Sequence, residues 1–235
     1  MTGNIVKEWC QQNQISITDE QITAFEIYAG LLVEWNQKMN LTAITEPTEI
    51  AVKHFIDSIT LLKYANIPAN ASLIDIGTGA GFPGIPLLIL RPDLRLTLLD
   101  SLNKRLIFLK EVCHTLRVSA ELLHARAEEY GQNQAYREQY DVAVSRAVAN
   151  LPALCEYCMP YVKTGGVFYS MKGSDGRNEL KNADNAIRQL GGKARKIIAL
   201  TLPDDSSRTI IAIDKIKPTP TQYPRRGVKI NKSPL

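Results

Sequence analysis

The chain has 235 residues, 45% of them hydrophobic, and a formal net charge of +4. This length suits one α/β domain with an extension. No apolar run approaches the ~18 residues of a membrane span, and residues 1–14 lack the pattern of a secretory signal. Composition therefore argues against a membrane protein and predicts a cytoplasmic one that needs no membrane partner.

In chain order, residues 1–70 are expected to form a helical extension, with helices over the segments 4–14, 19–39 and 47–65, where apolar residues recur at helical spacing. Strands and helices then alternate through residue 216. Strands are expected over 72–76, 94–99, 120–123, 140–144, 166–171, 193–202 and 208–216. Helices are expected over 83–90, 102–117, 151–162 and 174–190. This alternation predicts a mostly parallel sheet covered on both faces, with one antiparallel strand near its edge.

A glycine-rich turn follows the first strand, in the stretch 73–84. Its Gly79, Gly81 and Gly84 spell G-x-G-x-x-G, which is the dinucleotide fingerprint, and Asp100 follows where a ribose-binding acid is expected. Asp75 favours a different ligand, because a carboxylate at the strand's end would repel a pyrophosphate. S-adenosylmethionine carries a sulfonium and an α-amine and suits this acid better. A dinucleotide and a purely structural turn are the alternatives.

Cys155 and Cys158 form a lone C-x-x-C pair inside an expected helix. No second pair and no paired histidines complete a zinc set, so no metal site is predicted. Two thiols on one helix face are expected to be core residues, with a redox motif as the alternative.

Several blocks along the chain resemble one family of S-adenosylmethionine-dependent methyltransferases. The blocks are residues 35–43, 54–58, 74–86, 98–101, 104–105, 145–147 and 223–226. They resemble the bacterial small-subunit (16S) ribosomal RNA guanine-N7 methyltransferase family, also called the glucose-inhibited division protein B family. The resemblance implies a Rossmann-like seven-stranded α/β methyltransferase fold, with 16S ribosomal RNA, the small ribosomal subunit or an assembly particle as partner. No obligate protein partner is evident.

The same resemblance implies roles for individual residues. The donor site would comprise Gly77, Phe82, Ala127, Glu128 and Arg146. Asp100 is expected to join them, because a carboxylate at the end of the second strand can accept hydrogen bonds from ribose hydroxyls. The alternatives are an acid at a helix start for Asp100, an exposed turn for Glu128 and a surface ion pair for Arg146. His54 is expected either to join the N-terminal helices to the sheet or to contact RNA.

The loop after the fourth strand, residues 144–149, contains neither a cysteine nucleophile nor an Asp/Asn-Pro-Pro-aromatic motif. Guanine N7 has an in-plane lone pair and no proton to lose, so its methylation needs positioning rather than a general base. We therefore expect no catalytic acid or base. Arg146 and Lys172 are candidate RNA contacts, because a guanidinium can bond guanine O6 or a phosphate.

Residues 217–235 form a basic tail with five cations and no acid. We expect it to be extended and to contact RNA phosphates through Arg225 and Arg226, with a solvated, disordered end as the alternative. Tyr223 is expected to pack against the sheet rather than stack on a base. The tail is also expected to lie apart from the donor site.

A nicotinamide-dependent oxidoreductase and a non-catalytic RNA-binding protein are the competing functions.

Overall fold

The computed structural model describes residues 1–146 and 148–235. The segment before the sheet is helical: α1 (Thr2–Gln12), α2 (Asp19–Met39), α3 (Pro47–Glu49), the π-helix η1 (Ile50–Ile56) and α4 (Asp57–Tyr64). The three expected helical segments are present, but the third winds as a π-helix in its middle. Such wide turns occur often at functional sites.

The sheet has seven strands: β1 (Ser72–Ile76), β2 (Arg95–Asp100), β3 (Ala120–His124), β4 (Tyr140–Arg146), β5 (Val162–Lys172), β6 (Gly192–Thr201) and β7 (Ser207–Lys215). Their order is β3-β2-β1-β4-β5-β7-β6. The first five strands pair in parallel, whereas β7 is antiparallel to both neighbours. The predicted seven-stranded sheet with one antiparallel strand near its edge is confirmed.

The later helices are α5 (Gly84–Leu90), α6 (Asn103–Leu116), α7 (Ala127–Tyr130), α8 (Leu151–Cys158), the 3₁₀-helix η2 (Met159–Tyr161), α9 (Gly176–Asn182), α10 (Asp184–Gln189) and α11 (Gly227–Lys232). The single helix expected over 174–190 is two helices. The helices α7 and α11 were not expected, because four and six residues are too few for helical periodicity to show.

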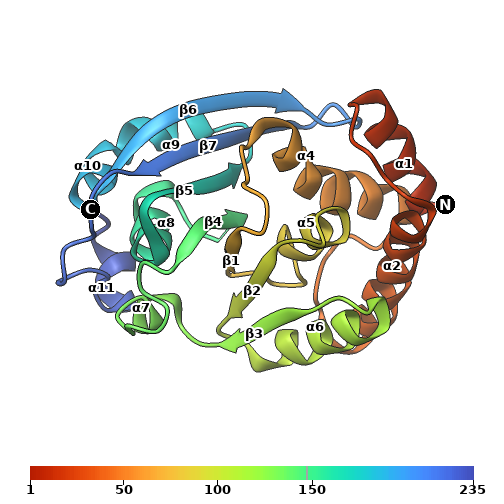
Figure 1. Cartoon of the computed structure of the whole chain (residues 1–235), viewed down its shortest axis with the longest axis horizontal. Coiled ribbons are helices and arrows are strands. Elements are labelled where there is room, and N and C mark those ends of the chain that lie inside the picture. The colour runs from red at the N-terminus through yellow and green to blue at the C-terminus, as the bar shows by residue number, and fades with distance from the viewer. Residues whose placement is uncertain (147) are drawn as a thin grey trace.

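Helices cover both faces of the sheet (Figure 1). One apolar cluster packs α1, α2, α4, α5 and α6 against one face, with Phe25, Leu32 and Leu109 among its buried residues. The other cluster packs α8 and α10 against the opposite face, with Leu154 and Ile187 among its members. The N-terminal helices and the C-terminal α11 lie on opposite sides of the molecule in this view.

The strand order reverses around β1. The chain runs from β1 outward to β2 and β3, and then returns to β4 on the other side of β1. In open parallel sheets, ligands bind at the carboxyl ends of the strands where the order reverses. The fold therefore places a binding site beyond Ile76, Asp100 and Arg146.

Candidate functional site

A cavity of about 680 Å³ opens at this edge of the sheet. A volume of this order suits a nucleoside-sized ligand. Residues from every predicted donor position line it: Gly77, Phe82, Asp100, Ala127, Glu128 and Arg146. Residues far apart in the sequence are thus brought together, and their binding of a methyl donor stays a prediction.

Most backbone N–H groups of the glycine turn are already used within the protein. Gly77 and Thr78 donate to the Leu99 carbonyl at 2.9 and 3.1 Å, and Gly81 and Phe82 both donate to the Thr78 carbonyl at 2.9 Å. A dinucleotide fold needs such groups free to cradle a pyrophosphate. This turn therefore does not offer that cradle, despite its G-x-G-x-x-G spelling.

Asp75 lies behind the turn and holds it in shape. Its Oδ2 accepts hydrogen bonds from the Thr78 hydroxyl at 2.7 Å and from the Gly84 N–H at 2.8 Å. Its Oδ1 is buried and has no hydrogen-bond partner among the described residues. Burial raises the pKa of Asp75 to about 6, partly offset by these two hydrogen bonds. The acid thus adds a negative potential beneath the turn, which suits a cationic ligand.

Asp100 ties the second strand to the turn. Its Oδ2 accepts from the Gly79 N–H at 2.9 Å, its Oδ1 accepts from the Leu102 N–H at 2.9 Å, and Arg105 forms an ion pair with it at 3.1 Å. The contact with Leu102 matches the alternative role of an acid near a helix start. Arg105 also donates to Oδ1 at 3.4 Å, so these contacts use all of the about four acceptor positions of the carboxylate, and a ligand hydroxyl would replace one of them.

Arg146 is 13% exposed in its side chain and joins β4 to the π-helix. Its guanidinium donates to the Lys53 carbonyl at 3.0 Å and to Asp57 Oδ2 at 3.0 Å, and it lies 5.0 Å from the Phe82 ring centre. Burial lowers the pKa of Arg146 and the Asp57 charge opposes this. The Asp57 carboxylate, the Lys53 carbonyl and the face of the Phe82 ring therefore hold the planar guanidinium in one orientation.

His54 fixes the same group from the other side. Its Nδ1 lies 3.3 Å from the Arg146 guanidinium, which can only donate, and its Nε2 lies 2.8 Å from the Thr42 hydroxyl. We infer that Nδ1 accepts and that Nε2 carries the proton. Burial and the Arg146 charge lower the pKa of His54 to about 3, so the ring is neutral. His54 thus joins the N-terminal helices to the sheet, which is the first of the two roles expected for it.

An aromatic cluster supports the cavity floor from the N-terminal helices. Phe82 stacks on His54 with ring centres 4.5 Å apart and on Tyr28 at 5.5 Å. The Tyr28 hydroxyl also donates to the Ala80 carbonyl in the glycine turn. The N-terminal extension therefore shapes the site directly.

A second cavity, of about 640 Å³, adjoins the first and shares His54, Arg146, Val148 and Ala149 with it. Four cations and two acids line it, which gives a net charge of +2: Lys53, Arg146, Lys172, Arg208, Asp57 and Glu179. Such a positive cavity suits an anionic partner.

Lys172 is buried beside this second cavity. Its ammonium pairs with Glu179 at 2.8 Å and donates to the Ala149 carbonyl. Glu179 in turn accepts from the Leu151 N–H at 2.7 Å. Lys172 therefore holds the loop between β4 and α8, and an RNA contact from it stays a prediction.

The tail is folded onto the domain rather than extended from it. Arg137 donates to the Thr219 and Tyr223 carbonyls at 2.7 and 2.8 Å. Tyr223 is buried, as expected, and its hydroxyl donates to Gln189 at 2.6 Å. Arg225 is engaged by the buried Glu156, whereas Arg226 is exposed. Contacts of Arg225 and Arg226 with RNA stay predictions.

The expectation that the tail lies apart from the donor site is wrong. Gly227, Val228 and Asn231 of α11 line the first cavity. Separation along the sequence gave no measure of separation in space, and a six-residue helix leaves no periodic signal. Leu41, Thr42, Val148 and Tyr157 also line the cavity and were not predicted to do so.

Three further expectations concern thiols, metals and membranes. Cys155 and Cys158 are both buried, and burial raises the pKa of each thiol, which fits core residues rather than a redox pair.

Within residues 1–146 and 148–235, no cluster of three or more His, Cys, Asp or Glu side chains is placed to hold a metal ion. No helix in this described part is long and apolar enough to span a membrane.

Comparisons with known proteins give the family. Residues 21–209 match the model of the family GidB, rRNA small subunit methyltransferase G. The "Ribosomal RNA small subunit methyltransferase G" of Alkaliphilus metalliredigens is 49% identical, over 98% of each chain. That of Acetivibrio thermocellus is 51% identical, over 94% of this chain and 91% of its own.

Among solved structures, M. jannaschii TYW2 in complex with AdoMet is similar with a TM-score of 0.52 and 11% identity. The match covers 69% of this chain and 76% of that one, and it shows a shared fold. A family match over most of the chain and nearly full-length relatives agree with the seven-stranded sheet. The chain belongs to the GidB family, the rRNA small subunit methyltransferases G.

Proposed function

We propose that this protein transfers a methyl group from S-adenosylmethionine to N7 of a guanine in 16S ribosomal RNA. The observation that carries the proposal is the pair of adjoining cavities that meet at Arg146. One suits a nucleoside-sized donor and the other is positively charged. The names of the relatives support ribosomal RNA as the substrate class.

The residues of the first cavity fit the donor. Asp100 would accept a ribose hydroxyl in place of its longer contact with Arg105, and the orphaned Asp75 Oδ1 favours positive charge nearby. The engaged N–H groups of the turn disfavour the diphosphate of a nicotinamide dinucleotide. Ala127 and Glu128 would flank the adenosine, and Gly77, Phe82 and Arg146 would lie toward the reacting end.

When bound, S-adenosylmethionine supplies an electrophilic methyl group on a positively charged sulfur. Guanine N7 attacks the methyl carbon directly and in line, its lone pair forms the new C–N bond, and the electrons of the breaking C–S bond remain on sulfur. No proton moves in this step. The protein then needs to orient the base, and orientation alone can contribute on the order of 7–11 kcal/mol.

The groups nearest Arg146 support a reaction without a general base. His54 is neutral and both of its ring nitrogens have partners. Asp57 pairs with Arg146 at 3.0 Å and with Arg208 at 3.3 Å. His54 therefore has no free basic nitrogen, and Asp57 is paired with two guanidiniums through Oδ2. Arg146 instead offers charge and a planar fork for guanine O6 or a phosphate.

The second cavity would admit the target base and its phosphates, with Lys53 and Arg208 as further cations at its rim. We propose that free 16S RNA, an assembly particle or the small subunit presents that base. We propose a cytoplasmic location, because ribosomal RNA is the proposed substrate.

The test is transfer of a labelled methyl group to 16S RNA from cells that lack the enzyme. We expect one labelled guanine, with the strand cleavage under reduction and aniline that is specific for N7-methylguanine. Label on an exocyclic amine or a pyrimidine would overturn the proposed chemistry. RNA binding without transfer would identify a non-catalytic binding protein, and micromolar NAD(H) binding without S-adenosylhomocysteine binding would identify an oxidoreductase.

A further inference from the structure

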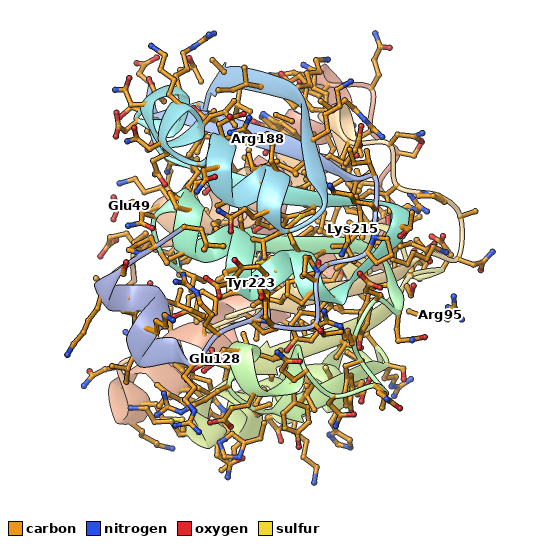
Figure 2. The ribbon with its side chains drawn as sticks, turned by 90° about the vertical axis from the view of Figure 1, so that its left-hand side faces the viewer. Glu49, Arg95, Glu128, Arg188, Lys215 and Tyr223 are labelled. Carbon is orange, nitrogen blue, oxygen red and sulfur yellow. The ribbon has the colours of Figure 1, made fainter. Side chains whose placement is uncertain are left out.

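The C-terminal helix α11 lies across the cavity end that contains Ala127 and Glu128. Gly227 begins this helix and packs against Glu128, since an added Cβ there would lie 2.2 Å from Glu128 Oε1. Figure 2 labels Glu128 beside this helix. Val228 and Asn231 line the cavity from the helix, and Tyr157 lines it from α8.

An ion pair with a buried acid fixes both ends of α11. Ahead of the helix, the Arg225 N–H donates to Glu156 Oε1 at 2.7 Å, and the guanidinium pairs with Oε2 at 2.6 Å. Beyond the helix, the same guanidinium donates to the Ser233 carbonyl at 3.1 Å. Glu156 is fully buried. Removing the cation would leave that charge uncompensated, so the pair holds α11 in one position.

Two further contacts set the position of the helix. Ile230 is fully buried, so one face of α11 is anchored in the protein interior. The Tyr157 hydroxyl donates to Asn231 Oδ1 at 3.1 Å, at the cavity wall. The wall is therefore built by α8 and α11 together.

Val228 differs from its neighbours on this helix. It is 70% exposed although it is apolar, and it lies between exposed cationic positions. Val148, on the loop after β4, is 43% exposed and lines the same cavity. Two exposed valines in one cavity suit the apolar face of a flat ring better than they suit water.

We propose that α11 is a wall of the methyl-donor site, that Val228 contacts the purine ring of the donor, and that Arg225 acts as a positioning residue through Glu156. This inference rests on the proposed function, because it takes the first cavity as the donor site. The tail would then contribute to donor affinity.

The experiment is calorimetric titration of S-adenosylhomocysteine into full-length protein and its variants. Val228→Ser should weaken binding about three- to tenfold, as expected for losing the contact of one valine side chain. Lys229→Ser is the matched control, because it changes an adjacent exposed residue of the same helix, and its affinity should stay within about twofold of wild type. Equal affinities for Val228→Ser and wild type would overturn the contact.

Arg225→Ala should raise the KM for the donor about tenfold or more and lower the maximal rate at saturating donor by a smaller factor. Arg225→Lys should rescue only part of this, because lysine lacks the planar fork. Unchanged KM in both variants, with a lowered melting temperature, would show a purely structural strap. If Arg225→Ala does not fold, Val228→Ser decides. If wild-type protein binds no S-adenosylhomocysteine, the proposed function fails rather than this inference.

Discussion

The N-terminal helices and the C-terminal tail both lie outside the alternating β/α core, and both line the first cavity. They differ in the interactions that attach them to the domain. The N-terminal helices bury large apolar side chains such as Phe25, Tyr28 and Phe55 against the sheet. The C-terminal tail buries Tyr223 and Ile230, and it is otherwise attached by one ion pair at a buried acid and by hydrogen bonds to its backbone carbonyls. The difference shows that the N-terminal helices depend mainly on apolar burial, whereas the proposed donor wall depends more on polar contacts.

The largest expected effect is on stability, and it tests the apolar packing of the N-terminal helices. Phe55 is fully buried, and its ring centre lies 5.0 Å from that of Phe25 and 5.3 Å from that of Tyr28. Phe55→Ala should lower the free energy of unfolding by about 3–5 kcal/mol, because it leaves a cavity. Urea denaturation measures this.

Ile230→Ala is the matched change in the tail, because it also truncates a fully buried apolar side chain. It should release α11 locally and weaken donor binding, with a much smaller effect on global unfolding. Equal loss of global stability in the two variants would break the comparison, because the tail would then belong to the same cooperative unit as the N-terminal helices.

The second-largest effect concerns Arg146, which we propose orients the base. Arg146→Lys keeps the charge but loses the fork that contacts Asp57 and the Lys53 carbonyl. We expect the maximal rate to fall about 10- to 100-fold, which corresponds to roughly 1.4–2.7 kcal/mol of transition-state stabilisation. Donor affinity should fall less, because the base is oriented only in the ternary complex. A lysine variant with a near-normal rate would reduce Arg146 to a general charge.

These two sides also differ in how far they could be predicted from the sequence. The N-terminal helices follow from apolar spacing around Phe25 and Leu32, and the glycine turn and Asp100 follow from local motifs. The pairing of Glu156 with Arg225 joins residues 69 positions apart and leaves no periodic or motif signal. Two partners of Arg146, Lys53 and His54, likewise lie on a π-helix, whose extra width cannot be read from apolar spacing, and Asp57 follows directly after it.

The third prediction uses pH and His54. The folded pKa is about 3 and the ordinary value is 6.5, so between these values the unfolded chain binds a proton that the folded chain does not. Stability from this group is therefore full above pH 6.5 and falls as the pH drops, by about 1.4 kcal/mol per pH unit. His54→Gln should remove this dependence.

The raised pKa of Asp75 acts in the opposite direction below about pH 6, so wild type alone would show a flattened curve. The informative quantity is the difference between wild type and His54→Gln in urea denaturation from pH 4 to 7. That difference should grow as the pH rises, in favour of wild type. Parallel curves would mean that His54 is solvated and does not lock Arg146.

The smallest effect tests the outer surface of the tail. Arg226 is exposed, whereas its neighbour Arg225 is committed to Glu156. If the tail grips RNA, Arg226 is the better placed of the two for a phosphate, and Arg226→Ala should reduce the log–log salt slope of RNA affinity by about 0.7–0.9. Lys110→Ala, which removes an exposed cation from α6, should leave the slope unchanged. A slope that does not change in Arg226→Ala would leave the tail with the donor wall as its role, and the positive second cavity would then supply the phosphate contacts.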